Sequence, residues 1–275
     1  MTQLLNLLTH DFVLQACDRR LTYPNGTIAD PDANKAAWWE LGTAFVYSGW
    51  ATMPPDERPT DYWLGDVLAP LDMDGDALVH LAERAAEVVG SEERQAFLGI
   101  SWARGDSDDD LRPMAVMVSN AYGDEGWLEE PRSDFTVLIR LLRPSMPFQL
   151  GACPPLLEDE HRLAAVQFEY LQEQGAGPAE FGNVLVETVR RVAARNCAVG
   201  EAVLLNCYPR NAHGSGSITT AGPNLETRSF SHVPADSTQA IHLAPTFISK
   251  NIRIEGLHLD VPPGTRLVQF GDDPT

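Results

Sequence analysis

Residues 1–20 read MTQLLNLLTHDFVLQACDRR, and an apolar strand pattern begins almost at the first residue. Two apolar runs, 3–8 and 12–17, are separated by a short polar turn, which predicts a β-hairpin that returns residues 18–20 beside the start of the chain. Apolar residues occupy both faces of the two strands, so we expect a sheet that is covered on both sides. Because most chain termini fray, a terminus tied into the core suggests that the position of Thr2 matters.

Further strand and helix patterns follow this hairpin. Helices are predicted at 60–71, 74–89, 157–174 and 177–196, and at 74–89 and 177–196 the prediction rests on apolar residues that recur on one side. Strands are predicted at 36–40, 43–48, 97–103, 113–119, 135–142 and 201–208. Residues 211–240 are rich in Ser, Thr, Gly and Pro and are predicted as a long loop, with short strand-like runs in 241–270.

This order of elements is typical of an α+β fold in which two sheets pack face to face between outer layers of helices. We therefore predict a four-layer αββα sandwich. Residues 1–210 would form this domain, and residues 211–275 a loop-rich C-terminal extension that could add edge strands.

The composition argues against several classes of function. The net charge of −19 disfavours binding to nucleic acids and to anionic membranes. No apolar run approaches the roughly 18–20 residues of a membrane span, and no secretory signal is recognisable, so we expect a cytoplasmic protein. The four cysteines and seven histidines form no metal-binding motif, and no nucleotide-binding motif occurs, so we predict neither a metal nor a cofactor.

Arginine is far more frequent than lysine among the basic residues. Of the 20 Lys and Arg residues only two, Lys35 and Lys250, are lysines. Arginine carries a planar, delocalised charge, whereas lysine carries a compact one. A lysine at position 35 in such a chain suggests a need for a compact ammonium, although chance remains the alternative.

Four residues in order along the chain resemble a known family. They are Thr2 in MTQ, Asp18 in ACDRRLT, Lys35 in ANKAAWW and Gly49 in FVYSGWA. This set resembles the proteasome-like branch of the N-terminal nucleophile (Ntn) hydrolases. The branch includes proteasome β subunits and the peptidase component of the bacterial ATP-dependent two-part protease. The order of strands and helices resembles the family out to about residue 208.

The resemblance implies an amide-bond hydrolase, either a peptidase or a small-molecule amidase. Thr2 would be the nucleophile once Met1 is removed, with its own α-amine as the general base. The Lys35 ammonium would keep that amine unprotonated and stabilise the alkoxide, and Asp18 would hold Lys35 in place. The backbone N–H at Gly49 would face the oxyanion.

Other positions depart from the family pattern. QLGACPP has Ala152 where the family usually has a serine, and RNCAVGEA has Asn196 and Val199 where the family has aspartate and serine. We predict Arg20 and Asn196 as residues that support the site.

Two alternatives to the threonine hydrolase stay open. The chain could be a catalytically silent Ntn-fold protein used for assembly or binding, as proteasome α subunits are. In the other alternative the chain is an enzyme whose nucleophile is a cysteine, Cys153 or Cys17. The resemblance also implies self-association through the helices at 157–174 and 177–196, a peptide or amide substrate, and a possible ATP-dependent unfoldase partner.

Overall fold

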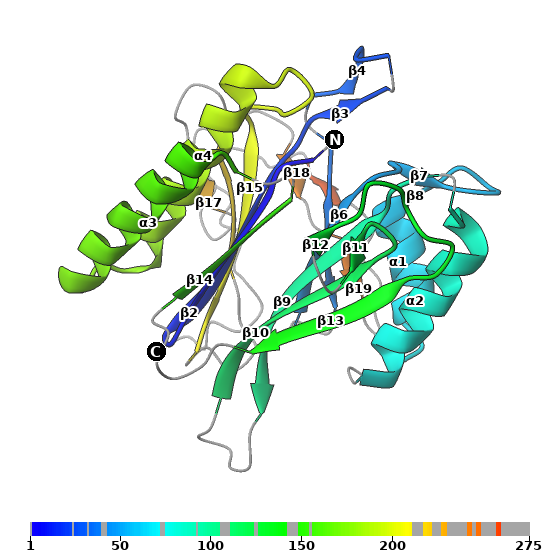
Figure 1. Ribbon diagram of the computed structural model, residues 1–275, viewed down its shortest axis with the longest axis horizontal. Helices are drawn as coiled ribbons and strands as arrows, with labels where there is room; N and C mark the ends of the chain where they lie inside the picture. Colours follow the sequence, from blue (N-terminus) through cyan, green and yellow to red (C-terminus); the bar gives the residue numbers. More distant parts are fainter. Residues whose placement is uncertain are drawn as a thin grey trace. The chain divides into compact units, whose positions relative to one another are not determined.

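The computed structural model shows a mixed α+β protein (Figure 1). It describes residues 2–23, 25–31, 33–39, 43–71, 75–91, 93–104, 111–123, 126–141, 148–153 and 156–210, and five strands beyond them, 217–221, 227–229, 241–243, 246–248 and 257–259. Its contacts divide the chain into two compact units. The first comprises residues 1–33, 146–243 and 258–275, and the second comprises residues 34–145 and 244–257.

The first unit is built on a six-stranded antiparallel sheet. The strand order is β14 (Phe148–Cys153), β1 (Leu4–Thr9), β2 (Phe12–Asp18), β15 (Val203–Pro209), β16 (Ser217–Ala221) and β17 (Thr227–Ser229). All residues of β1 and β2 are buried, so both faces of the N-terminal hairpin are covered, as the apolar pattern predicts. The hairpin register places Leu4 opposite Cys17.

Two helices cover one face of this sheet (Figure 1): α4 (Pro178–Arg195) packs on β1, β2 and β15, and α3 (Glu158–Glu173) packs on α4. Phe181 of α4 contacts both Phe12 and Phe168, with ring centroids 5.3 and 5.8 Å apart. Arg195 makes a two-pronged ion pair with Glu160, at 2.6 and 2.7 Å. This hydrogen bonding holds the pKa of Glu160 below its usual value.

The second unit has its own six-stranded sheet and helix pair. The strand order is β13 (Thr136–Leu141), β10 (Leu111–Ser119), β9 (Ala96–Arg104), β6 (Thr43–Ser48), β5 (Ala36–Trp39) and β19 (Thr246–Ile248). The helices α1 (Thr60–Leu68) and α2 (Gly75–Val89) bury their apolar sides together with residues of this sheet. Trp63 of α1, for example, stacks on Phe97 of β9 with 5.7 Å between ring centroids.

Short strand pairs complete the described structure. They are β3 (Leu21–Thr22) with β4 (Ile28–Asp30), β7 (Thr52–Met53) with β8 (Arg58–Pro59), β11 (Tyr122–Gly123) with β12 (Gly126–Trp127), and β18 (Ile241–Leu243) with β20 (Leu257–Leu259). In the described residues no helix has both the length and the apolar character needed to cross a membrane.

The α+β class and all four helix positions agree with the sequence prediction. The prediction of a continuous loop over 211–240 was wrong, because β16 and β17 lie within it. The β-branched run Ile218-Thr219-Thr220 suits a strand, and it pairs with the edge of β15 that β2 leaves open. Strand β14 was also not predicted.

Candidate active site

Thr2 lies at the open end of the first unit's N-terminal hairpin, away from the turn at residues 10 and 11. The next residue, Gln3, is joined to Asp18 in both directions: its N–H donates to Asp18 Oδ1 at 2.7 Å, and its carbonyl accepts from the Asp18 N–H at 3.2 Å. Thr2 is 4% exposed and Asp18 is fully buried. The sheet register therefore brings the predicted nucleophile and the predicted aspartate to the same end of β1 and β2.

The Asp18 carboxylate accepts three backbone hydrogen bonds. Besides Gln3, Arg20 N donates to Oδ2 at 3.1 Å and Gly200 N donates to the same oxygen at 3.0 Å. Hydrogen bonds to a charged group each contribute about 1.5–3 kcal/mol, so these donors offset much of the cost of burying the carboxylate. Asp18 thus ties together the start of β1, the end of β2 and the turn that precedes β15.

Arg20 and Asn196, predicted as supporting residues, both hold that turn. Arg20 Nη1 donates to the carbonyls of Cys197 and Val199, at 2.8 and 3.1 Å. Asn196 follows the last residue of α4, and its Oδ1 accepts the Ala198 N–H at 3.0 Å. Their hydrogen bonds shape the segment from which Gly200 reaches Asp18.

The positions that depart from the family pattern lie on both sides of this region. Val199 is fully buried, and its side chain belongs to the apolar core formed with residues of β1, β2 and α4. On β14, the backbone of Ala152 pairs with Leu5 and that of Cys153 with Leu4. Cys17 is buried.

Lys35 and Gly49 belong to the second unit. Lys35 immediately precedes β5 and is fully buried, and its carbonyl accepts the Tyr47 N–H at 3.3 Å. Gly49 follows the last residue of β6 and has φ +125°. Because β5 and β6 are antiparallel neighbours, these two residues lie at the same end of their sheet.

The segment before β5 is held by Asn34. Its Nδ2 donates to Asp61 Oδ2 at 2.8 Å, and its Oδ1 accepts the Ala36 N–H at 3.1 Å. Its carbonyl accepts from the Tyr47 hydroxyl at 3.2 Å. The backbone on both sides of Lys35 is therefore fixed to β6 and α1. A lysine is rarely buried this completely in proteins, so Lys35 stays a functional candidate.

The structure thus groups the predicted site residues in two sets. Thr2, Asp18, Arg20 and Asn196 belong to the first unit, and Lys35 and Gly49 belong to the second. Sequence reasoning missed Gly200. The only sign of it in the sequence is a glycine shortly after a predicted helix. The structure gives the reason for this glycine, because a Cβ at position 200 would lie 2.8 Å from Arg20 Cβ.

A cavity of about 320 Å³ lies elsewhere in the second unit, between the β7–β8 hairpin and the helices α1 and α2. Its lining includes Met53, Arg58, Trp63, His80 and Arg84, and none of the predicted site residues. Among the described residues, no group of three or more His, Cys, Asp or Glu side chains could hold a metal ion.

No protein-family model matches this chain, and no curated protein sequence matches it significantly.

Proposed function

We propose that this protein hydrolyses amide bonds, as a peptidase or amidase, and uses Thr2 as an N-terminal nucleophile after Met1 is removed. The observation that carries the proposal is the reciprocal hydrogen bonding between Gln3 and Asp18, which fixes the residue after Thr2 to a buried carboxylate. The proposed fold is the four-layer αββα sandwich of proteasome-like Ntn hydrolases. Two observations support it: each unit pairs a sheet with two helices, and the N-terminal hairpin is buried on both faces.

In the proposed reaction the α-amine of Thr2 takes the proton of the Thr2 hydroxyl. The alkoxide attacks the substrate carbonyl, and the leaving amine departs with that proton, which leaves an ester on Thr2. Water then hydrolyses the ester and restores the hydroxyl. The mechanism requires the Lys35 ammonium within reach of Thr2, where it favours the neutral amine and stabilises the alkoxide. It also requires the Gly49 N–H to face the oxyanion.

The labelling of Thr2 by a peptide epoxyketone tests this function, because such an electrophile needs both a hydroxyl and a free amine on one residue. We expect intact-mass measurement to show that Met1 is absent and that the wild-type protein takes up one label. Peptide mapping should place the label on Thr2. Thr2→Ser should still react, because it keeps the hydroxyl, whereas Thr2→Ala should not react. A fully active sample that retains Met1 would exclude the mechanism.

The alternative is a catalytically silent Ntn-fold protein used for assembly or binding. It is favoured by the burial of Thr2 and by Ala152, Asn196 and Val199, which replace polar residues of the family pattern. The same assay separates the two readings. If wild-type Thr2 reacts no faster than a free threonine peptide, the silent protein is the better description.

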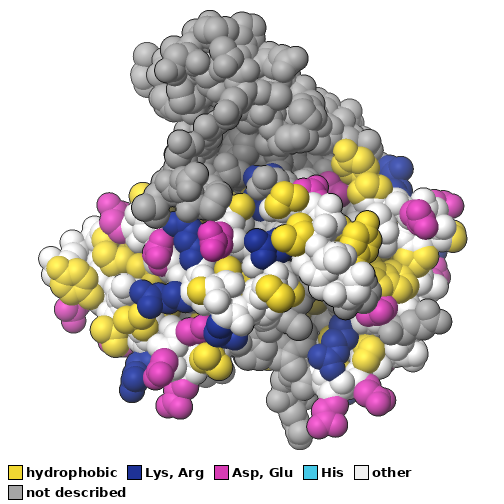
Figure 2. Space-filling model, turned by 90° about the horizontal axis from the view of Figure 1, so that it is seen from above, with side chains coloured by type: hydrophobic (Ala, Val, Ile, Leu, Met, Phe, Trp, Pro, Cys, Tyr) yellow, Lys and Arg dark blue, Asp and Glu magenta, His cyan; other side chains and the backbone are white. Residues whose placement is uncertain are grey.

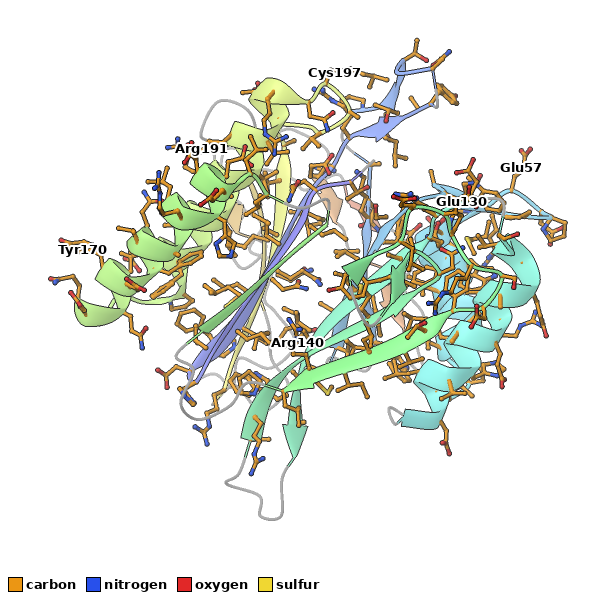
Figure 3. The ribbon with its side chains drawn as sticks, viewed as in Figure 1. Glu57, Glu130, Arg140, Tyr170, Arg191 and Cys197 are labelled. Carbon is orange, nitrogen blue, oxygen red and sulfur yellow. The ribbon has the colours of Figure 1, made fainter. Side chains whose placement is uncertain are left out.

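We also propose that the protein self-associates through α3. Only Ala164 and Phe168 of this helix are buried. Leu163, Val166 and Tyr170 are 38%, 57% and 61% exposed, and their spacing places them on one side of the helix. Figure 3 shows Tyr170 projecting outward from α3. An exposed apolar stripe of this kind is typical of an interaction surface. Apart from this surface, a peptide substrate and an ATP-dependent unfoldase are the further partners that we propose.

Light scattering coupled to size exclusion tests this surface. We expect the wild-type protein to be an oligomer at micromolar concentration, and Val166→Asp with Tyr170→Asp to shift it to monomers, because two charges would be desolvated at the contact. Val79→Asp is the matched control, since Val79 is 50% exposed on α2. A wild-type protein that is strictly monomeric would contradict the proposal.

Figure 2 shows charges of both signs interspersed with apolar groups on the described part of one face.

A further inference from the structure

The turn after β6 is packed against the start of β9. Gly49 has φ +125°, a conformation that glycine adopts far more readily than other residues. A Cβ at this position would overlap Gln95 Oε1 and the carbonyl oxygen of Arg94. The backbone at Gly49 therefore has its place set by the residues just before β9.

The Gln95 side chain makes that contact specific. Its Oε1 accepts the N–H of Trp50 at 2.6 Å, and Gln95 is fully buried. This hydrogen bond holds the Gly49–Trp50 peptide plane, which contains the Gly49 carbonyl. The Gly49 N–H lies in the preceding peptide plane, and its direction follows from the φ of Gly49, where the close packing of Gln95 and Arg94 leaves no room for a Cβ. An apolar side chain of the same length would fill the space but would leave the Trp50 N–H without this acceptor.

Gln95 is itself held by the end of β10. Its N–H donates to Asn120 Oδ1 at 2.8 Å, and its carbonyl accepts both the Ser119 hydroxyl at 3.0 Å and the Asn120 N–H at 3.3 Å. Asn120 Nδ2 in turn donates to the carbonyls of Gly90 and Glu93, at 3.0 and 2.8 Å. Ser119 and Asn120 are both 1% exposed. Every member of this chain of contacts is therefore fixed by packing and by hydrogen bonds.

The Gln95 amide carries a cost that packing alone does not explain. Its Nε2 is buried and has no hydrogen-bond partner among the described residues. A buried donor left unsatisfied costs about 1–3 kcal/mol. A glutamine at this position is therefore less stable than an apolar side chain that fills the same space. The atom of its side chain that contacts the Gly49 turn is the amide oxygen Oε1.

We propose that Gln95 is a positioning residue for the reaction: its amide oxygen fixes the Gly49–Trp50 peptide, and its packing against Gly49 holds the φ of that residue, so that together they aim the Gly49 N–H at the oxyanion. This inference rests on the proposed function, in which Gly49 supplies the oxyanion donor. Loss of one such donor typically lowers the rate about 10²–10³-fold. Loosening the donor instead of removing it should have a smaller effect.

The test is the rate of Thr2 labelling by a peptide epoxyketone, separated into the maximal rate and the half-saturating concentration. In Gln95→Met we expect the maximal rate to fall about 10- to 100-fold, with the half-saturating concentration nearly unchanged. Gln95→Glu keeps an acceptor for the Trp50 N–H and should recover most of the rate. Gln15→Met is the matched control: Gln15 is also fully buried, and its Oε1 accepts from Asn206 Nδ2 at 3.1 Å in the middle of β2.

Gln15→Met should lose stability but label at the wild-type rate. If Gln95→Met does not fold, Ser119→Ala takes its place. It removes one of the two hydrogen bonds on the Gln95 backbone carbonyl, together with the one that the Ser119 hydroxyl accepts from the Ala121 N–H; its maximal rate should fall several-fold. Wild-type and variant proteins that label at equal maximal rates would overturn this inference alone. A wild-type protein that does not label at all would overturn the proposed function, and the role of Gln95 with it.

Discussion

Replacing Lys35 with arginine is expected to slow the labelling of Thr2 at least about a hundredfold, which corresponds to roughly 3 kcal/mol of lost transition-state stabilisation. Lys35 is fully buried, and the backbone on both sides of it is fixed by hydrogen bonds. The longer, planar guanidinium therefore cannot place its charge where the compact ammonium lies. Lys35→Met, which keeps the length and removes the charge, should lose at least as much.

The controls for Lys35 separate chemistry from folding. Lys250→Arg makes the same change at the chain's other lysine, which lies outside the described residues, and it should label at the wild-type rate. Thermal unfolding shows whether each variant is folded. If folded Lys35→Arg and Lys35→Met both react as fast as the wild type, Lys35 is a structural residue and the proposed mechanism loses its electrostatic component.

The N-terminal part of the fold could be predicted because its sequence carries repeated signals. Two apolar runs around a polar turn specify the hairpin, and the hairpin register brings Asp18 to the start of β1 without any knowledge of distant residues. The helices α2 and α4 were predictable for the same reason, since each repeats its apolar spacing over several turns. Strand β14 offered only a short run interrupted by Gly151 and followed by two prolines.

The contacts that complete the candidate site could not be predicted in this way. Gly200 lies 182 residues from Asp18, and Gln95 lies 45 residues from Trp50. Each is a single residue outside the helices and strands, where no periodicity exists to be recognised. Each contact also uses a backbone N–H group as its donor, that of Gly200 in one case and that of Trp50 in the other. Every residue except proline carries such a group, so the sequence gives no sign of which one is bound. The composition singled out Lys35, but its complete burial follows from tertiary packing.

Asp18→Asn is expected to lower the free energy of unfolding by about 2–4 kcal/mol and to remove most Thr2 labelling. In the wild type, one carboxylate oxygen accepts from Gln3 N and the other accepts from Arg20 N and Gly200 N. An asparagine has one oxygen and one NH2 group. In either orientation, the NH2 group therefore faces at least one N–H donor, which loses its hydrogen bond.

Both orientations of the asparagine damage the site. If the NH2 group faces Gln3, the residue after the nucleophile is released. If it faces the other two donors, the turn before β15 is released and two hydrogen bonds are lost. Urea unfolding measures the loss of stability as a lower midpoint at unchanged slope.

Asp11→Asn is the matched control for this substitution, because Asp11 is exposed in the turn at the other end of the same hairpin. It should leave both stability and labelling close to the wild type. If Asp18→Asn unfolds at the same urea concentration as Asp11→Asn and labels as fast, the backbone donors around Asp18 neither stabilise the hairpin nor hold Thr2. If it is destabilised but labels at the wild-type rate under folded conditions, Asp18 serves the fold alone, and the reaction depends on Thr2 and Lys35 without it.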